Sequence, residues 1–181
     1  MNEKQLKSKG KFLSLVLRHR PETIKIKLDE NGWTDVDILL QQMNAFQKHI
    51  NFQELEYLVE NNNKKRYSFN EDKTKIRANQ GHSVTVDLNL QPITPPDLLY
   101  HGTADKYLNG ILEQGLMKKQ RHHVHLSADI ATAKTVGKRH GKLILFEVYA
   151  GKMNADGLQF FKSENGVWLT EEVPVRYLKR I

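Results

Sequence analysis

The order of hydrophobic and polar residues predicts different secondary structure in the two halves of the chain. In the first half, the apolar residues of segment 12–17 recur at helical spacing. An amphipathic helix is therefore expected to end near residue 18, ahead of Pro21. A short strand is predicted over 24–28, and the sequence Asp-Glu-Asn-Gly at 29–32 is typical of a turn.

Two further helices are predicted from their capping signals. Thr34 with Asp37 has the spacing of a capping box and would open a helix over 36–43. Asn51 with Glu54 has the same spacing and would open a helix over 52–59.

A β-hairpin is predicted after these helices. Polar and apolar residues alternate over 66–69 and again over 74–77, and the four residues between them favour a turn. Three helices followed by a basic hairpin is the order of a winged-helix module, which usually contacts nucleic acid. The first lobe, 1–91, is therefore predicted to be a winged-helix lobe.

Three prolines in segment 92–96 favour an extended connector, so a domain boundary is expected there. The second lobe, 97–181, is predicted to be rich in strands, and the whole chain is predicted to be α+β. The expected strands are 98–100, 124–126, 143–149, 158–161 and 167–169, and the expected helices are 105–114 and 129–136, followed by Gly115 and Gly137.

Composition and charge narrow the class of protein. The 181 residues include 28 Lys or Arg and 21 Asp or Glu, which gives a net charge of +7, and they include no Cys. Disulfides and thiolate metal sites are therefore excluded, and the positive charge points to an acidic partner, with nucleic acid as the first choice. No apolar stretch approaches the ~20 residues that span a bilayer. A cytoplasmic location with no membrane attachment is expected, and no obligatory protein partner is evident.

A cluster of potential cations, Arg18-His19-Arg20, lies where the first helix must end. Segment 4–27 holds eight Lys or Arg and one acidic residue, Glu22. Guanidinium and imidazole groups without a carboxylate suit a phosphate ligand. The alternative is a solvated cationic helix end that favours the helix dipole.

Two segments of the second half could also carry chemistry. The sequence Tyr-His-Gly-Thr at 100–103 is predicted to follow a strand and precede a helix, where a glycine would let a planar ligand meet the backbone; a generic turn is the alternative. In a strand over 121–127, Arg121, His123, His125 and Ser127 would share one face. A zinc site is disfavoured there, because one strand would supply two ligands and no HExxH pairing is present. A polar strand face lining a cleft is the preferred interpretation, and no metal is expected.

Several blocks in order and spacing give the chain a strong resemblance to the RNA 2′-phosphotransferase family of the KptA type. The likeness extends over about 9–178, and its blocks are KFLSLVLRHRPETIKIKLDENGWTDVDILL, KKRYSF, IRANQGHS, PPDLLYHGTA, RHHVHLSADIATAKTVGKRHG and ENGVWLT. The resemblance implies a winged-helix RNA lobe followed by an ADP-ribosyltransferase lobe that binds NAD⁺.

The resemblance also implies a two-step reaction on an RNA with an internal 2′-phosphate. The phosphate attacks C1″ of the nicotinamide ribose, and nicotinamide leaves. The ribose 2″-hydroxyl then attacks that phosphorus, which releases RNA with a 2′-OH and ADP-ribose 1″,2″-cyclic phosphate. NAD⁺ is consumed as a co-substrate.

The family's catalytic residues correspond to Arg18, His19, Arg66 and Arg121. We expect the three arginines to hold the phosphate and His19 to position it or to move a proton. The likeness further implies cofactor-binding residues. These are His101, Gly102, Thr103, His125 and Ser127, with Arg139 as a partner of the diphosphate.

The chain departs from many ADP-ribosyltransferases at 165–168, where the matching strand has no catalytic glutamate. A phosphate acceptor is already anionic and needs no general base, so this departure fits the reaction above. Two alternatives stay open at this point. The protein could be a nucleic-acid or protein ADP-ribosyltransferase, or a catalytically inactive RNA-binding protein.

Overall fold

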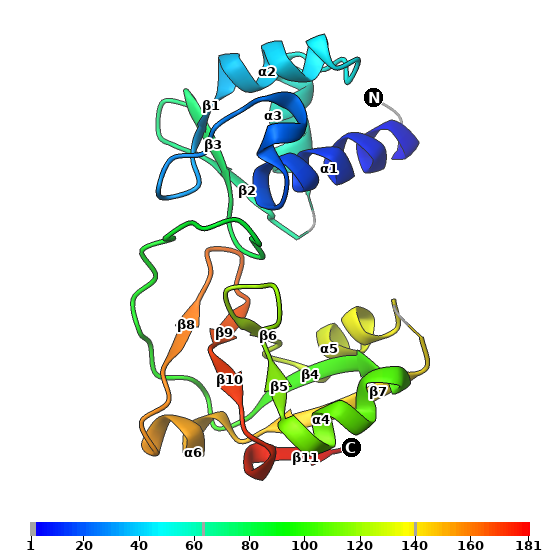
Figure 1. Cartoon of the computed structure of the whole chain (residues 1–181), viewed down its shortest axis with the longest axis vertical. Coiled ribbons are helices and arrows are strands. Elements are labelled where there is room, and N and C mark those ends of the chain that lie inside the picture. The colour runs from blue at the N-terminus through cyan, green and yellow to red at the C-terminus, as the bar shows by residue number, and fades with distance from the viewer. Residues whose placement is uncertain (1–2, 63, 140) are drawn as a thin grey trace. The chain divides into compact units, whose positions relative to one another are not determined.

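The chain forms two compact units, Met1–Asn89 and Leu90–Ile181, in a computed structural model that describes residues 3–62, 64–139 and 141–181 (Figure 1). The predicted connector, 92–96, lies in the first residues of the second unit. Helices accompany small antiparallel sheets in both units, which is compatible with the predicted α+β class.

The described residues of unit 1 form three α-helices, one 3₁₀ helix and a three-stranded antiparallel sheet of order β1-β3-β2. Its elements are α1 (Glu3–Arg18), the 3₁₀ helix η1 (Pro21–Ile24), β1 (Thr34–Asp35), α2 (Val36–Ala45), α3 (Phe52–Glu60), β2 (Tyr67–Phe69) and β3 (Lys75–Ala78). Their apolar faces enclose one core, whose fully buried members include Leu13, Leu17, Leu39, Leu55 and Ile76. This is the element order on which the winged-helix prediction rests.

The predicted hairpin is confirmed, because β2 and β3 pair antiparallel with Tyr67 opposite Ala78 and Phe69 opposite Ile76. The turn between them is fastened by Asn70, whose Oδ1 accepts from the backbone N–H of Lys75 at 2.8 Å.

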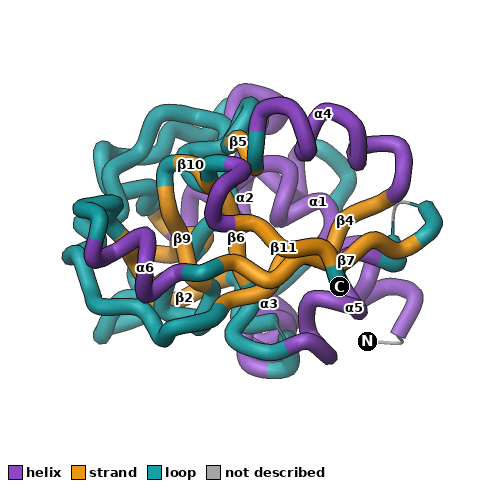
Figure 2. The backbone as a smooth tube through the Cα atoms, turned by 90° about the horizontal axis from the view of Figure 1, so that it is seen from below, coloured by secondary structure: helices purple, strands orange, loops and turns teal. Residues whose placement is uncertain are grey.

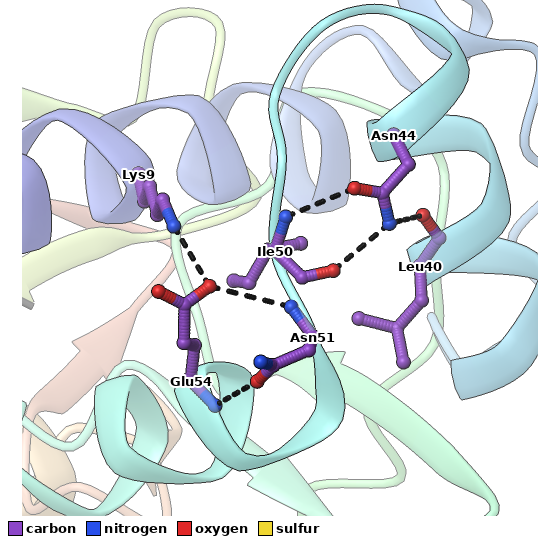
Figure 3. Close-up of polar contacts among 6 residues, drawn as sticks. All are labelled: Lys9, Leu40, Asn44, Ile50, Asn51 and Glu54. Atoms are coloured by element: carbon purple, nitrogen blue, oxygen red, sulfur yellow. Dashed lines mark hydrogen bonds and ion pairs between the residues drawn. The ribbon is translucent and has the colours of Figure 1, made fainter.

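The capping box at the start of α3 is also confirmed (Figure 3). The Asn51 side chain accepts from the backbone N–H of Glu54 at 2.8 Å, and Glu54 accepts from the backbone N–H of Asn51 at 3.3 Å. Lys9 of α1 donates to the same Glu54 carboxylate at 2.9 Å, and this contact lowers the pKa of Glu54. The start of α3 is therefore tied to the middle of α1.

Two predictions for unit 1 are wrong. Segment 24–28 is not a strand: Pro21 begins a 3₁₀ turn, and Lys25 takes a left-handed φ of 58° that breaks extended structure. The apolar residues Ile24 and Ile26 are buried by this turn instead of by strand pairing. The cap of α2 is Asp35, which accepts from Ile38, while Thr34 pairs with Ile76 in the sheet.

Unit 2 is built from short antiparallel strands with helices around them (Figure 2). Its elements are β4 (Leu99–Ala104), η2 (Asp105–Tyr107), α4 (Leu108–Gln114), β5 (Leu116–Met117), β6 (Val124–Leu126), α5 (Ile130–Gly137), β7 (Leu143–Val148), α6 (Ala150–Ala155), β8 (Phe160–Lys162), β9 (Trp168–Thr170), β10 (Glu172–Val173), η3 (Val175–Tyr177) and β11 (Leu178–Arg180). The five predicted strands and both helices are present, the 124–126 strand with the predicted ends and the others with shifted ends. The predicted 105–114 helix begins as the 3₁₀ turn η2.

The strands of unit 2 form two three-stranded sheets, of order β11-β7-β4 and β6-β9-β8, and a pair of β10 with β5. Outside the named pairings, Tyr100 of β4 forms a bridge with Ser127, which follows β6. One buried core serves these strands, with Leu99, Phe146, Val148, Phe160 and Tyr177 among its fully or almost fully buried members. Apart from this bridge, β4 and β6 belong to different sheets, and most of the unit 2 residues discussed below lie at this split between the two strands.

Candidate functional site

Arg18 and His19 lie at the C-terminal end of α1, where the apolar helix face ends ahead of Pro21. The backbone carbonyl of Arg18 accepts from the N–H groups of Ser83 and Val84, at 2.9 and 3.3 Å. His19 is exposed, and its Nδ1 is 2.9 Å from the hydroxyl of Ser83. Segment 83–84 therefore fixes the end of the helix that carries both residues.

Arg66 comes directly before β2 and lies beside Arg18. The Nη2 group of Arg18 donates to the backbone carbonyl of Arg66 at 3.4 Å, and the Arg18 guanidinium lies 5.9 Å from the ring centroid of Tyr67. Only 9% of the Arg18 surface is exposed to solvent. The structure thus places Arg66 beside Arg18, which His19 follows directly in the chain; all three are predicted catalytic residues.

Tyr67 lies beside the Arg18 guanidinium, and the sequence-based prediction assigns it no role. Its hydroxyl donates to the carbonyl of Gly10 at 2.7 Å and lies 2.5 Å from the hydroxyl of Ser14. Burial raises the pKa of Tyr67, so the phenol stays protonated as the donor that Gly10 requires. The alternation of polar and apolar residues at 66–69 was the signal that could have placed it inward.

In unit 2, His101 and His125 are joined across the split between β4 and β6. The Nδ1 atom of His101 is 3.1 Å from the carbonyl oxygen of His125. A carbonyl only accepts, so Nδ1 carries the proton and Nε2 presents a lone pair in the neutral ring. Burial lowers the pKa of His101, and the nearby charge of Arg121 lowers it further. A neutral His101 can therefore accept a hydrogen bond from a hydroxyl group.

The backbone of Gly102 faces the same split. Tyr100 exchanges both backbone hydrogen bonds with Ser127, at 2.9 and 2.8 Å, so its N–H and C=O point toward β6. Backbone groups alternate in direction along an antiparallel strand, so those of Gly102 also point toward β6 and away from β7. One donor and one acceptor side by side match a planar carboxamide.

The predicted placement of segment 100–103 needs correction, whereas the role of Gly102 in ligand binding stays a prediction. Segment 100–103 lies inside β4 and is not a turn before a helix. The missing side chain faces α5: a Cβ atom at Gly102 would lie 2.6 Å from the carbonyl carbon of Ala133 and would overlap its oxygen. Gly137 is equally close, because a Cβ atom there would lie 2.8 Å from the carbonyl carbon of Gly102. Glycine is therefore required for helix packing on this strand.

The remaining predicted residues of unit 2 lie around this strand pair. Thr103 follows Gly102 and is buried, with 9% of its surface exposed. Arg121 is exposed in a bend before β6, so the predicted strand 121–127 begins only at Val124. Arg121 is nevertheless within electrostatic range of His101. Arg139 is exposed in the turn after α5.

The predicted site residues thus form two sets, one in each unit. The first contains Arg18, His19 and Arg66, and the second is centred on His101, Gly102, His125 and Ser127, with Arg121 nearby. Their meeting over one phosphate stays a prediction. Within the described residues, no helix combines the length and the apolar character that crossing a bilayer would require.

Comparison with known proteins decides the family. Residues 4–172 match the model of the family described as RNA 2′-phosphotransferase, Tpt1 / KptA family. The chain belongs to the RNA 2′-phosphotransferase family. This confirms the resemblance drawn from the sequence blocks.

Three relatives of this family are similar over nearly their whole length, and each is named "Probable RNA 2′-phosphotransferase". The Flavobacterium johnsoniae protein is 52% identical over 179 residues, covering 99% of this chain and 98% of the relative. The Fusobacterium nucleatum protein is 53% identical over 171 residues, covering 94% and 96%. The Nostoc punctiforme protein is 51% identical over 181 residues, covering both chains completely.

Proposed function

We propose that this protein is an NAD⁺-dependent RNA 2′-phosphotransferase that removes an internal 2′-phosphate from RNA, with tRNA-like molecules as the substrate class. The observation that carries the proposal is membership of the RNA 2′-phosphotransferase family over residues 4–172. The local geometry of each unit supports it, because each presents groups that one of the two substrates would need.

In unit 1, Arg18, His19 and Arg66 supply the groups that a phosphate with several charged oxygens would bind. In the first proposed step, a phosphate oxygen bonds to C1″ of the nicotinamide ribose and the bond to nicotinamide breaks. In the second, the 2″-hydroxyl bonds to phosphorus and the RNA 2′-oxygen leaves with a proton. Negative charge stays on the phosphate oxygens throughout, so fixed guanidinium groups, with Arg121 as the third, would stabilise the second transition state. His19 would position the phosphate or move that proton.

In unit 2, the described geometry fits the nicotinamide half of NAD⁺. Nε2 of His101 would accept from a ribose hydroxyl, and the backbone N–H and C=O of Gly102 would hold the carboxamide. Segment His125–Ser127 would border the nicotinamide ring. Thr103 would hydrogen-bond a neighbouring polar group. Arg139, exposed after α5, would meet the diphosphate.

The test incubates the protein with NAD⁺ and a short RNA that carries one internal 2′-phosphate. The expected products are the 2′-OH RNA, nicotinamide and ADP-ribose 1″,2″-cyclic phosphate, separated by chromatography and mass spectrometry. Nicotinamide release with a stable ADP-ribosylated nucleic acid or protein would support an ADP-ribosyltransferase instead. RNA binding with no change in either substrate would support an inactive RNA-binding protein.

Variants separate the two sets of residues. Arg66→Ala and Arg121→Ala should slow transesterification about 100-fold, so that 2′-phospho-ADP-ribosylated RNA accumulates. His101→Ala should instead raise the NAD⁺ concentration needed for turnover. Arg20→Ala, which removes an exposed guanidinium next to His19, is the matched control and should retain both steps.

A further inference from the structure

We propose that Asn79 is a positioning residue that holds Arg66 in place for phosphate binding. The inference deepens the proposed function and rests on it. Asn79 directly follows β3 and is part of the sequence block IRANQGHS. Every contact in the argument lies within unit 1.

Asn79 binds the backbone on which Arg66 is carried at two consecutive peptide groups. Its backbone N–H donates to the carbonyl of Arg66 at 2.9 Å, which extends the β2–β3 ladder by one bond. Its side-chain Nδ2 donates to the carbonyl of Lys65 at 2.8 Å. Two adjacent carbonyls fixed by one residue leave the Arg66 backbone little freedom to rotate.

The carbonyl of Arg66 also accepts from Nη2 of Arg18, at 3.4 Å. One oxygen atom therefore links Asn79 to both arginines that unit 1 contributes to the proposed phosphate site. A shift of this peptide would move the Arg66 side chain and remove a contact of the Arg18 guanidinium together.

The backbone that Asn79 holds is in an unfavourable conformation. Lys65 has a φ of 38°, in the left-handed region that a residue with a Cβ atom avoids. A strained residue directly before a proposed phosphate ligand relaxes unless neighbouring groups restrain it. The Nδ2 bond to the Lys65 carbonyl is such a restraint.

Burial of the Asn79 side chain is unfavourable, because one of its polar atoms is left without a hydrogen bond among the described residues. Asn79 has 4% of its surface exposed, and its Oδ1 atom is buried with no hydrogen-bond donor among the described residues. Reversing the amide would turn Oδ1 toward the Lys65 carbonyl, which also only accepts, so the observed orientation is fixed. A buried amide with one unsatisfied atom contributes little to the stability of the core. Its hydrogen bonds instead hold the backbone at Lys65 and Arg66.

The first experiment measures both reaction steps of the wild-type enzyme and of Asn79→Ala in single-turnover reactions with NAD⁺ and the 2′-phosphorylated RNA. We expect transesterification to slow about 10- to 100-fold, with a much smaller change in the first step, so that the ADP-ribosylated RNA accumulates. A lower folded fraction reduces the amplitude of both steps equally, so it cannot produce this imbalance.

Asn70→Ala is the matched control in the same hairpin. Asn70 also fastens backbone, through Lys75 at 2.8 Å, and its side chain donates to the hydroxyl of Thr74 at 3.1 Å. It lies in the turn at the opposite end of β2 from Arg66. Its loss should leave the ratio of the two steps as in the wild type, and an Asn70→Ala ratio equal to that of Asn79→Ala would overturn the proposal.

A double-mutant cycle tests whether Asn79 acts through Arg66. In the Arg66→Ala background, Asn79→Ala should slow the second step much less than in the wild type, because the side chain it positions is already absent and only the contact of Arg18 with the residue-66 carbonyl is left to lose. An undiminished effect in that background, or equal slowing of both steps in the single variant, would contradict the positioning role.

A measurement without catalysis separates this inference from the proposed function. Hydrogen–deuterium exchange of peptides covering 64–67 should rise about 10-fold in Asn79→Ala and stay unchanged in Asn70→Ala. If the wild-type enzyme forms no product, the proposed function fails, and the exchange result still decides whether Asn79 holds this segment. Unchanged exchange would refute the inference whatever the activity.

Discussion

At the scale of single residues, His101 shows how the surroundings select one chemical form of a side chain. Its Nδ1 proton is committed to the carbonyl of His125, and burial disfavours the charged ring. Only the neutral tautomer with a free Nε2 lone pair satisfies both conditions. The sequence gives the residue type and its neighbours, but the tautomer follows from the strand geometry.

We predict that the stability of unit 2 falls as the pH drops below 6.5, the ordinary pKa of the imidazole. The folded-state pKa of His101 is lowered, so below pH 6.5 the unfolded chain binds the proton first and unfolding becomes more favourable. Above pH 6.5 both states are neutral and the stabilisation is fully present.

Urea unfolding of wild type and His101→Gln at pH 7.5 and 5.5, followed by a signal from unit 2, checks this. His101→Gln should lose less stability between the two pH values. His49→Gln, an exposed substitution in unit 1, serves as the control. Equal pH dependence of wild type and His101→Gln would refute the prediction.

Gly102→Ala is predicted to destabilise unit 2 by about 3 kcal/mol or more, because backbone atoms of α5 occupy the place of the new methyl group. Gly110→Ala is the matched control: its Cβ atom would meet nothing within 4 Å, and alanine favours the helix interior by about 0.5–1 kcal/mol. Thermal unfolding of both variants should therefore shift in opposite directions. A Gly102→Ala protein as stable as wild type would show that α5 does not press on this strand.

At the scale of secondary-structure elements, the ends of helices are set by single polar groups. Asn51 and Glu54 satisfy each other's backbone N–H groups at the start of α3, and Lys9 adds a partly exposed ion pair. Exposed ion pairs contribute little, so the cap supplies most of this stabilisation.

We predict that Asn51→Ala lowers the free energy of unfolding of unit 1 by about 1 kcal/mol, because the backbone N–H of Glu54 loses the side-chain oxygen that accepts from it. Gln53→Ala replaces an exposed residue of the same turn and should stay within about 0.5 kcal/mol of wild type. Chemical denaturation monitored by far-ultraviolet circular dichroism distinguishes the two. Equal effects would mean that the cap is not what stabilises α3.

The elements that could be predicted from the sequence are those with a local signal. The 66–77 hairpin has strict alternation around a polar turn, and the α3 cap has both members of the box. The expected 24–28 strand failed because its apolar residues are equally compatible with a buried 3₁₀ turn, and Pro21 decided between them. The two-residue strands β1, β5 and β10 are defined only by partners distant in sequence.

For the candidate site, the sequence identified residue types but not their support. Arg18 and Arg66 are 48 positions apart, and no local pattern indicates that one contacts the carbonyl of the other. The sequence predicts ligand access at Gly102, whereas the contact of Gly102 with α5 depends on tertiary packing. Asn79 carries no signal in composition or spacing.

At the scale of the whole molecule, two cores account for the two units. The buried residues of the first all come from unit 1 and those of the second all from unit 2. Each unit therefore has its own apolar interior.

We predict that a cavity in one core is felt mainly in its own unit. Leu55→Ala should destabilise unit 1 by about 2–5 kcal/mol and Leu99→Ala should do the same in unit 2, because both side chains are fully buried. Native-state hydrogen exchange, resolved by peptide, should show loss of protection within 3–62 and 64–89 for the first variant and within 90–139 and 141–181 for the second. Uniform loss of protection in either variant would indicate a single cooperative unit.

The contact between Gly102 and Gly137 has a mechanical consequence. Where backbone meets backbone there are no side chains whose rotation could absorb a displacement, so β4 and α5 must move as one rigid piece. Helix α5 therefore cannot serve as a lid that swings over the strand carrying His101.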